Sequence, residues 1–335
     1  MPSSFQFQPP PLAPGLSLRK FRGPVDYPRM VEVANACSAA DRVDIVRTVE
    51  SMASDYAAFT ECDPFRDIVV AEIDGQMVGY ARGWRRLEIS GTTLLCQLGF
   101  VKPRWRRRGI GRVLVGAMEQ HQRAMAAAMA PGGPAMFNIF LTEHEKSCAA
   151  LLSTCGYTPA RYFHSMRRPH LRDIEVYGLP TGIETRPVRA EHYEAIWAAD
   201  IEAFNDHWGR VQWRDGDYEA WLIDKIVFQP HLWCIAWDVS KNEIASQVRA
   251  FVNAQQNAQF NRLRGYTEFI SVRAPWRRQG IARALIARSL MAQRDAGLTE
   301  SQLEVDSANA TGATRVYEDC GFEVVKRNVV YRKTL

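Results

Sequence analysis

The amino-acid sequence predicts an α/β fold, of the α+β kind, made of two tandem domains that each hold a mixed, mostly antiparallel sheet flanked by helices. Three observations support this prediction. The chain has 335 residues, which is long for one domain and comfortable for two of about 150 residues each. Two long segments resemble each other. In both segments, short apolar runs alternate with stretches of helical periodicity, which indicates mixed strands and helices.

The internal repeat extends over nearly the whole chain. Three matches occur in the same order, with small insertions between them, pairing Arg19 with Arg186, Val101 with Val272, and Gly156 with Gly321. A repeat of about 165 residues has the size of a domain rather than of a solenoid unit. We therefore expect a flexible tail at 1–15, a first domain at 16–168, a linker at 169–182 and a second domain at 183–335.

Each copy is expected to contain the same elements in the same order. An apolar strand opens the copy, and one or two helices follow, over 27–58 in the first copy and 192–228 in the second. Strands then meander through hairpin turns at Asp74–Gly75 and Lys241–Asn242. The next strand leads through an arginine-rich turn into an amphipathic helix. Another strand, a short helix and two closing strands complete the copy.

Composition excludes several classes of protein. The seven cysteines are scattered and form no CxxC pair, which argues against a disulfide framework and against a metal site. No apolar run approaches the roughly 18 residues that cross a bilayer, and the first residues lack the pattern of a secretory signal. We therefore expect a cytoplasmic protein with no membrane partner. The net charge of +5 does not separate a nucleic-acid binder from a protein that binds a small polyanion.

The arginine-rich turns carry the strongest chemical signal. Each lies between a strand and a helix, and the residues concerned are Arg106, Arg107, Arg108, Gly109, Ile110 and Gly111 in the first copy and Arg277, Arg278, Gln279, Gly280, Ile281 and Ala282 in the second. The first N–H groups of a helix lack intrahelical partners, and glycine lets a phosphate approach them closely. A solvated basic loop or a nucleic-acid patch is the alternative. Neither copy has the interleaved aromatic residues of a single-strand groove, so we expect no nucleic-acid partner.

These turns, in both copies, resemble motif A of the GCN5-related N-acetyltransferase (GNAT) superfamily. The resemblance extends over 18–168 and 183–333, and the tandem arrangement is similar to that of two-domain bacterial acetyltransferases such as mycothiol synthase. It implies acetyl-coenzyme A as co-substrate, with its pyrophosphate held by the turn. It also implies that the preceding strand offers backbone groups to the pantetheine arm, from Phe100 and Val101 in the first copy and Ser271 and Val272 in the second.

The resemblance further implies that the second copy is the active one. In the family, a tyrosine on the helix after the fifth strand often protonates the departing thiolate. The repeat places Tyr317 opposite Leu152, so that only the second copy has a hydroxyl at this position. It also places Asn309, a coenzyme contact in relatives, opposite His144.

Glu268 is the candidate base or amine-positioning group. It lies on the strand before the second turn, and the first copy has Gln97 at the equivalent position, which cannot accept a proton. Some relatives have their glutamate two residues earlier, where this chain has Tyr266. The alternatives are a carboxylate paired with a nearby arginine such as Arg249, and catalysis through ordered water.

A polar and aromatic cluster follows the first helix of the second copy, at Asp206, His207 and Trp208. The resemblance places this region over the acceptor pocket. A histidine suits proton transfer, and Asp206 could attract a cationic amine. The alternative is a helix end in which the two polar residues satisfy backbone groups and Trp208 packs in the core.

These observations favour an N-acetyltransferase that moves acetyl from acetyl-CoA to the primary amine of a small molecule, by direct attack in a ternary complex. Acetylation of a protein or peptide is a second hypothesis. A non-catalytic acyl-CoA sensor or scaffold is a third, which Tyr317 disfavours. We expect a monomer or a homodimer, because two fused domains can supply the pairing that single-domain relatives obtain by dimerising.

Overall fold

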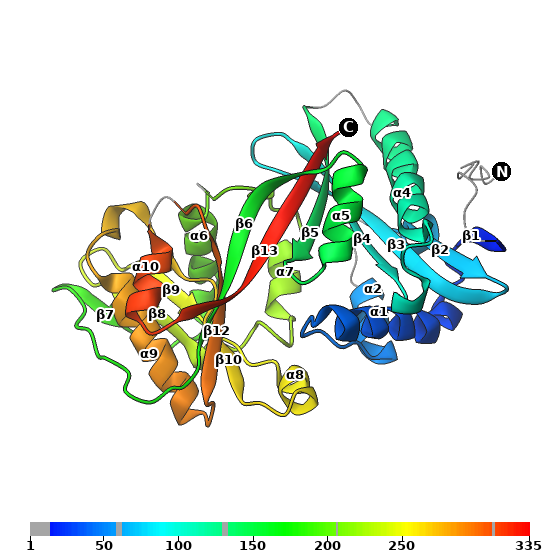
Figure 1. Cartoon of the computed structure of the whole chain (residues 1–335). Coiled ribbons are helices and arrows are strands. Elements are labelled where there is room, and N and C mark those ends of the chain that lie inside the picture. The colour runs from blue at the N-terminus through cyan, green and yellow to red at the C-terminus, as the bar shows by residue number, and fades with distance from the viewer. Residues whose placement is uncertain (1–13, 58–61, 129–132, 206, 310–311) are drawn as a thin grey trace. The chain divides into compact units, whose positions relative to one another are not determined.

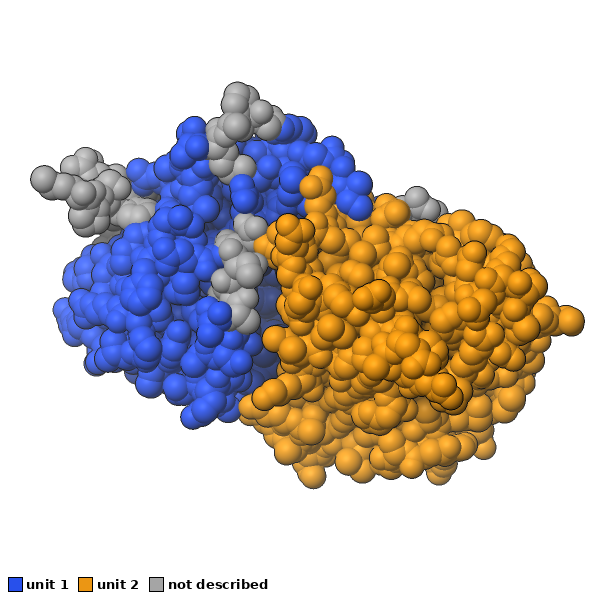
Figure 2. All heavy atoms as spheres, turned by 180° about the vertical axis from the view of Figure 1, so that it is seen from behind, with its two compact units in different colours: residues 1–161, 328–335 blue, residues 162–327 orange. Residues whose placement is uncertain are grey.

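The computed structural model describes residues 14–57, 62–128, 133–205, 207–309 and 312–335. The chain divides into two compact units, which have different colours in Figure 2. Unit 1 consists of residues 1–161 and 328–335, and unit 2 of residues 162–327. Most of the tail expected at 1–15 lies outside the described residues.

Unit 1 is built on a mixed sheet to which the end of the last strand of the chain belongs (Figure 1). The first four strands are antiparallel neighbours, and the fifth runs parallel to the fourth. The hairpin expected at Asp74–Gly75 is present, with φ values of 50° and 76° that match a type I′ turn. In sheet order the strands are β1 (Leu16–Lys20), β2 (Ile68–Ile73), β3 (Gln76–Leu87), β4 (Thr93–Val101), β5 (Ala135–Thr142) and β13 (Glu323–Thr334).

Helices cover both faces of this sheet because successive side chains of a strand point in opposite directions. Ile68 and Val70 of β2 pack in one apolar cluster with the first two helices, whereas Val69 and Ala71 pack with the fourth helix. The helices of this unit are α1 (Tyr27–Asp41), α2 (Val49–Ala57), α3 (Pro64–Asp67), α4 (Ile110–Ala127) and α5 (Lys146–Thr154).

Unit 2 contains two groups of strands. One group is antiparallel, in the order β11-β9-β8-β7, and the other has the order β6-β12-β10 with a parallel pair at its end. The strands are β6 (Thr158–Arg168), β7 (Ile183–Thr185), β8 (Trp233–Asp238), β9 (Glu243–Arg249), β10 (Arg264–Tyr266), β11 (Ser271–Val272) and β12 (Glu300–Asp306). The helices are α6 (Tyr193–Ala203), α7 (Asp217–Leu222), α8 (Ala254–Gln259), α9 (Ile281–Asp295) and α10 (Ala313–Asp319).

The helix after the second arginine-rich turn forms the core of unit 2. Leu285, Ile286 and Leu290 of α9 are fully buried, and they pack against Ala245 and Val248 of β9. A separate aromatic cluster joins α6 and α7 to β8 through Ile196, Trp221 and Trp233. The prediction of a mixed α/β fold with mostly antiparallel strands is confirmed.

The last strand of each copy pairs with a strand of the other copy. The last strand of the first copy belongs to the sheet of unit 2, and the last strand of the second copy belongs to the sheet of unit 1. Phe163–Arg168 of β6 pairs with β12 in unit 2, and Asn328–Thr334 of β13 pairs with β5 in unit 1. Apolar packing follows the same exchange, because Met166 lies in the core of unit 2 and Tyr331 lies in a cluster of unit 1. The expectation of two closing strands in each copy is wrong. Each copy has one long strand, whose pairing partner comes from the other copy.

Arg168 binds the start of the linker to the end of α10. Its Nε donates to the carbonyl of His170 at 3.0 Å, and its Nη2 donates to the carbonyl of Arg172 at 3.0 Å. Its Nη1 donates to the carbonyl of Cys320. Gly321 makes room for this guanidinium, because a Cβ at that position would lie 2.6 Å from Nη1.

Gly321→Ala is therefore expected to lower the free energy of unfolding by about 2 kcal/mol or more, because the backbone has φ = 81° and the new methyl group would displace Arg168. Gly297→Ala is the matched control. Gly297 also follows a helix and has φ = 85°, but its Cβ would meet open space, so only the left-handed strain of about 1 kcal/mol remains. Urea unfolding measures both values. Equal losses would show that the Arg168 contact contributes nothing.

Candidate active site

The two arginine-rich turns have the same backbone conformation. Arg107 and Arg278 both have φ = 63°, and the glycines two residues later have φ values of 80° and 79°. Each glycine immediately precedes its helix, α4 or α9. A Cβ on Gly280 would meet no atom within 4 Å, so the space beside its Cα is open. Such a turn, leading into the unpaired N–H groups of a helix start, is suited to bind a phosphate group.

The first arginine of each turn faces the protein rather than the solvent. Arg277 donates through Nε to the carbonyl of Val272 at 3.0 Å, and Arg106 donates in the same way to Val101 at 3.2 Å. Arg106 also forms a bidentate ion pair with Asp41, at 2.7 and 2.6 Å. These two arginines therefore hold the turn against the end of the preceding strand. The exposed side chains are those of Arg107, Arg108, Arg278 and Gln279.

In unit 2 the strand before the turn is split between two partners. Thr267 still donates its N–H to Gln302 of β12 at 2.9 Å, whereas Ser271 and Val272 pair with β9. Between them Phe269 has φ = 50°, a left-handed conformation that turns the chain from one partner to the other. The strands β12 and β11 thus diverge directly after Glu268.

Glu268 lies at the point of divergence. Its Oε1 accepts the N–H of Glu304 of β12 at 2.8 Å. Burial and the charge of the Glu304 side chain raise the pKa of Glu268 to about 8. The interpretation of Glu268 as an ion-pair partner of Arg249 is wrong, because the Arg249 guanidinium pairs with Asp200 at 2.8 Å.

Tyr317 is buried in the same neighbourhood as Glu268. It lies on α10, and its ring packs edge-on against the ring of Phe322, with 6.5 Å between the ring centroids. Burial, followed by the charge of Glu268, raises the pKa of the Tyr317 phenol. No described residue forms a hydrogen bond with its hydroxyl. The phenol therefore stays protonated at neutral pH and can donate that proton to a bound group.

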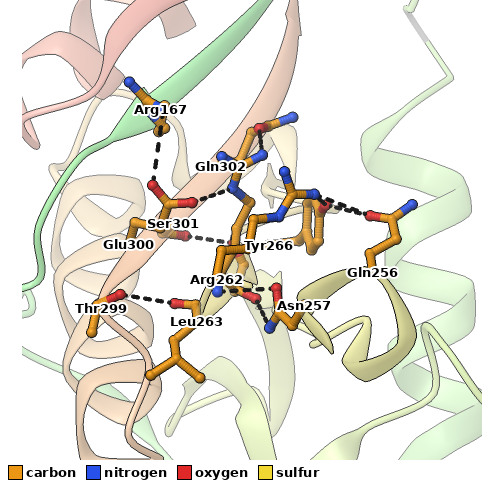
Figure 3. A network of polar contacts seen from close by, with 12 residues as sticks. Arg167, Gln256, Asn257, Arg262, Leu263, Tyr266, Thr299, Glu300, Ser301 and Gln302 are labelled. Atoms are coloured by element: carbon orange, nitrogen blue, oxygen red, sulfur yellow. Dashed lines mark hydrogen bonds and ion pairs between the residues drawn. The ribbon is translucent and has the colours of Figure 1, made fainter. Parts of the chain in front are cut away.

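A polar network fixes the segment that leads to Glu268 (Figure 3). The hydroxyl of Tyr266 donates to Gln256 of α8 at 2.8 Å. Arg264 reaches the Glu300 carboxylate through Nε and the Gln302 amide oxygen through Nη1, both at 2.7 Å. Because the two acceptors lie on β12, Arg264 holds β10 in register with β12 up to the point of divergence.

The predicted acceptor cluster is only partly described. Asp206 lies outside the described residues. Burial lowers the pKa of His207, against an opposing effect of Asp306. The His207 ring packs edge-on against the Phe204 ring, with 4.6 Å between the ring centroids. The Trp208 ring packs against the Phe163 ring, with 6.4 Å between the centroids. Burial keeps the His207 ring largely neutral, and Trp208 contributes to packing.

Local hydrogen bonds hold two further predicted coenzyme contacts of unit 2, Ser271 and Asn309. The carbonyl of Ser271 accepts a hydrogen bond from the Ser246 hydroxyl at 2.7 Å, which fixes the strand that precedes the turn. Asn309 follows the end of β12, and its N–H donates to the carbonyl of Asp306 at 3.1 Å. Residues 310–311, between Asn309 and α10, lie outside the described residues.

Unit 1 has the same turn conformation but different groups at the positions equivalent to Glu268, Tyr317 and Asn309. Gln97 is buried, and its amide donates to Gln122 at 2.9 Å and to the hydroxyl of Tyr157 at 3.2 Å. Leu152 is fully buried in an apolar cluster. His144, opposite Asn309, is exposed.

A cavity of about 570 Å³ opens in unit 1 where β4 and β5 diverge beyond Cys96 and Asn138. It runs along the strand and the arginine-rich turn, and its lining includes Phe100, Val101, Arg106, Arg107, Gly109 and Gly111. These six of the eight predicted coenzyme contacts of the first copy share one cavity, whereas Arg108 and Ile110 do not line it. Its volume is in the range of small-molecule sites.

Sequence reasoning missed three acidic residues of these sites. Asp41 ends α1 and binds Arg106. Glu304 and Asp306 influence the pKa values of Glu268 and His207. The alternation of β12, in which Leu303 and Val305 are buried, could have placed Glu304 on the opposite face. Nothing in the local sequence points to Asp41.

Two sequence models of one enzyme family match the chain, one in each copy. The model described as "Acetyltransferase (GNAT) family" matches residues 192–322, and "Acetyltransferase (GNAT) domain" matches residues 64–159. A mycothiol acetyltransferase of Salinispora arenicola (strain CNS-205) is 30% identical over 275 residues, which cover 81% of this chain and 82% of that protein. The chain belongs to the acetyltransferase (GNAT) family.

Solved structures agree with the GNAT assignment. A GCN5-related N-acetyltransferase from Sphaerobacter thermophilus superimposes with a TM-score of 0.73 at 26% identity, covering 96% of each chain. A tandem GNAT protein from the clavulanic acid biosynthesis pathway gives a TM-score of 0.66 at 14% identity, over 95% of this chain and 98% of that one, and supports the tandem fold.

Family membership identifies this GNAT chain as an acetyl-CoA-dependent N-acetyltransferase with tandem domains. The residues present fit that co-substrate, because both turns expose a positive-φ glycine before a helix start and both preceding strands diverge from a neighbour. Among the described residues, no helix is both long and apolar enough to cross a membrane.

Proposed function

We propose that unit 2 transfers the acetyl group of acetyl-CoA directly to the primary amine of a small molecule. The observation that carries this proposal is that Glu268, at the divergence of β12 and β11, acts through its charge on the buried Tyr317 phenol. A base and an acid at one strand opening meet the two proton transfers that amide formation from a thioester requires. The mycothiol acetyltransferase relatives support a small-molecule acceptor over a protein or peptide.

The proposed reaction proceeds in a ternary complex. The N–H groups of Gly280, Ile281 and Ala282 bind the pyrophosphate, with Arg278 and Gln279 beside them and Arg277 holding the turn in place. Ser271 and Val272 offer backbone groups to the pantetheine arm, and Asn309 contacts the coenzyme from the other side.

Proton transfers balance the bond changes. The neutral amine attacks the thioester carbon, a C–N bond forms and the C–S bond breaks. Glu268 accepts the proton that the amine loses, and Tyr317 gives its proton to the departing sulfur. The proton held by Glu268 then returns to the Tyr317 oxygen, which restores both groups. Because the Tyr317 pKa lies above that of Glu268, this last transfer is favourable.

We further propose that unit 1 binds acetyl-CoA without transferring the acetyl group. The 570 Å³ cavity and the matching turn support binding. Gln97 and Leu152 offer neither a base nor an acid at the positions of Glu268 and Tyr317. Unit 1 would then retain a thioester at a site that lacks the groups needed to use it.

The two glycines of the turns provide a matched test. Gly280→Val places a branched side chain at φ = 79° and is expected to abolish acetyl transfer and to reduce the acetyl-CoA stoichiometry from two sites to one. Gly109→Val makes the same change at φ = 80° and is expected to remove the other site, leaving Glu268 and Tyr317 untouched. Calorimetry with acetyl-CoA and a transfer assay on an amine panel give both readouts. If Gly109→Val abolished transfer and Gly280→Val did not, the assignment of activity to unit 2 would be wrong.

A further inference from the structure

Unit 2 holds a fully buried guanidinium beside the candidate acceptor region. Arg249 ends β9 with 2% of its surface exposed. Its guanidinium lies over the ring of Phe269 at 4.4 Å and near that of Trp221 at 5.3 Å. Its Nη2 pairs with the buried carboxylate of Asp200 at 2.8 Å. The same carboxylate also accepts the amide of Gln247 at 3.0 Å, so Asp200 is shared between two donors.

A second arginine adds positive charge to this cluster. Asp200 raises and Arg249 lowers the pKa of Arg210, which places Arg210 in the electrostatic range of both. The Arg210 side chain lies over the ring of Trp213 at 4.9 Å. Within the described residues Arg210 makes no ion pair. Among the described residues, the charge of the Asp200 carboxylate therefore acts on both guanidiniums.

The cluster contains N–H groups that the described residues do not satisfy. The buried nitrogens without a hydrogen-bond partner are Nε and Nη2 of Arg210 and Nε and Nη1 of Arg249. Charged N–H groups that are shielded from water and left unpaired cost free energy, and a bound anion would remove this cost. Burial lowers the pKa of both guanidiniums in spite of Asp200.

The position of the cluster connects it to the reaction. The N–H of Arg249 donates to the carbonyl of Glu268 at 3.0 Å, and Phe269 is the residue at which the strands diverge. Arg210 lies three residues after His207, and the charges of Arg210 and Arg277 both lower the pKa of that histidine. The cluster thus lies between the base and the segment that resembles the acceptor side of relatives.

We propose that Arg210, with Arg249 behind it, binds an anionic group of the acceptor, so that the substrate is a primary amine that also carries a carboxylate or phosphate. This inference rests on the proposed function, because it names the class of amine that unit 2 acetylates. Glu268 receives the amine end, and the guanidiniums receive the acidic end. Such a pair of opposite charges fixes the orientation of the acceptor and selects against neutral amines.

Matched amines test the proposal in the full-length protein. The probes are the ω-amino acids from glycine to 6-aminohexanoate, each with its carboxamide, and glucosamine 6-phosphate with glucosamine. With saturating coenzyme A, calorimetry is expected to show at least one acidic amine binding about 10-fold or more tightly than its neutral partner. Comparison of the amino acids with glucosamine 6-phosphate shows whether the site binds a carboxylate or a phosphate more tightly. If no acidic amine binds more tightly than its partner, the proposal is overturned.

Variants of Arg210 separate binding of an anion from support of the fold. Arg210→Gln is expected to raise the Kd of the preferred acidic amine about 10-fold or more and to leave that of its neutral partner unchanged, with partial recovery in Arg210→Lys. Arg294→Gln, an exposed arginine of α9, makes the same charge change as a control. Equal weakening of both partners by Arg210→Gln would overturn the proposal. Because binding is measured without turnover, tight acidic binding without acetyl transfer would instead refute the proposed function.

Discussion

Tyr317→Phe is expected to lower kcat by about 100-fold or more while the KM for acetyl-CoA changes little, because the variant keeps the buried ring and loses only the proton donor. Burial and Glu268 keep the wild-type phenol protonated throughout the neutral pH range. Steady-state kinetics on an accepted amine measure the effect. A single-turnover experiment with preloaded acetyl-CoA shows whether the loss lies in the chemical step.

Tyr157→Phe is the matched control in the first copy. Tyr157 is also buried, and its hydroxyl contacts the Gln97 amide at 3.2 Å, so its loss removes a hydrogen bond of unit 1 without touching the proposed acid. This variant is expected to keep the wild-type kcat. A Tyr317→Phe enzyme as fast as the wild type would show that the thiolate leaves without help from this residue.

Glu268→Gln is expected to remove a pH-dependent step from the reaction. A base works in its deprotonated form, and the folded-state pKa of Glu268 is about 8, above its ordinary value. The rate of the wild-type enzyme should therefore rise as pH increases through about 8 and level off above it. The amide of the variant cannot take the proton, so kcat should fall by about 100-fold and the rise near pH 8 should disappear.

The amine of the acceptor must not titrate near pH 8, because its own protonation would otherwise change the pH dependence of the rate. The aminooxy group of aminooxyacetate stays neutral across this range, and this compound carries the carboxylate of the proposed acceptor class, so a rise near pH 8 then reports a group of the protein. Glu304→Gln provides a second comparison, because the charge of Glu304 helps to raise the Glu268 pKa and its removal should move the rise to lower pH. A Glu268→Gln enzyme that kept the wild-type profile would assign the titration to another group and favour catalysis through ordered water.

The repeat, the α/β fold and the position of the turns before the two helices could be predicted because each depends on local sequence. Gly109 and Gly280 stand where a strand gives way to a helix, and only glycine adopts their φ values readily. The two arginine-rich segments are long enough to align without any knowledge of tertiary structure. The positions of Tyr317 and Glu268 then followed from the alignment of the two copies.

Other features depend on tertiary contacts that a linear pattern does not record. The arginine that begins each turn has the same charge as the arginines beside it, so the sequence does not show which of them binds within the protein. Arg106 pairs with Asp41, which lies 65 positions earlier. The apolar pattern of β13 suits any sheet edge, so its pairing with β5 could not be read from it. The same holds for Asp200, which partners a guanidinium on a different element.

The exchange of the closing strands β6 and β13 determines whether either half of the chain can be produced as a separate fragment. A fragment that ended at the linker would leave the hydrogen-bonding edge of β5 without β13, and a fragment that began there would leave β12 without β6. Each excised half would present an unpaired edge, open to other chains and to aggregation. Neither half is therefore a self-sufficient folding piece, although each carries a whole copy of the repeat.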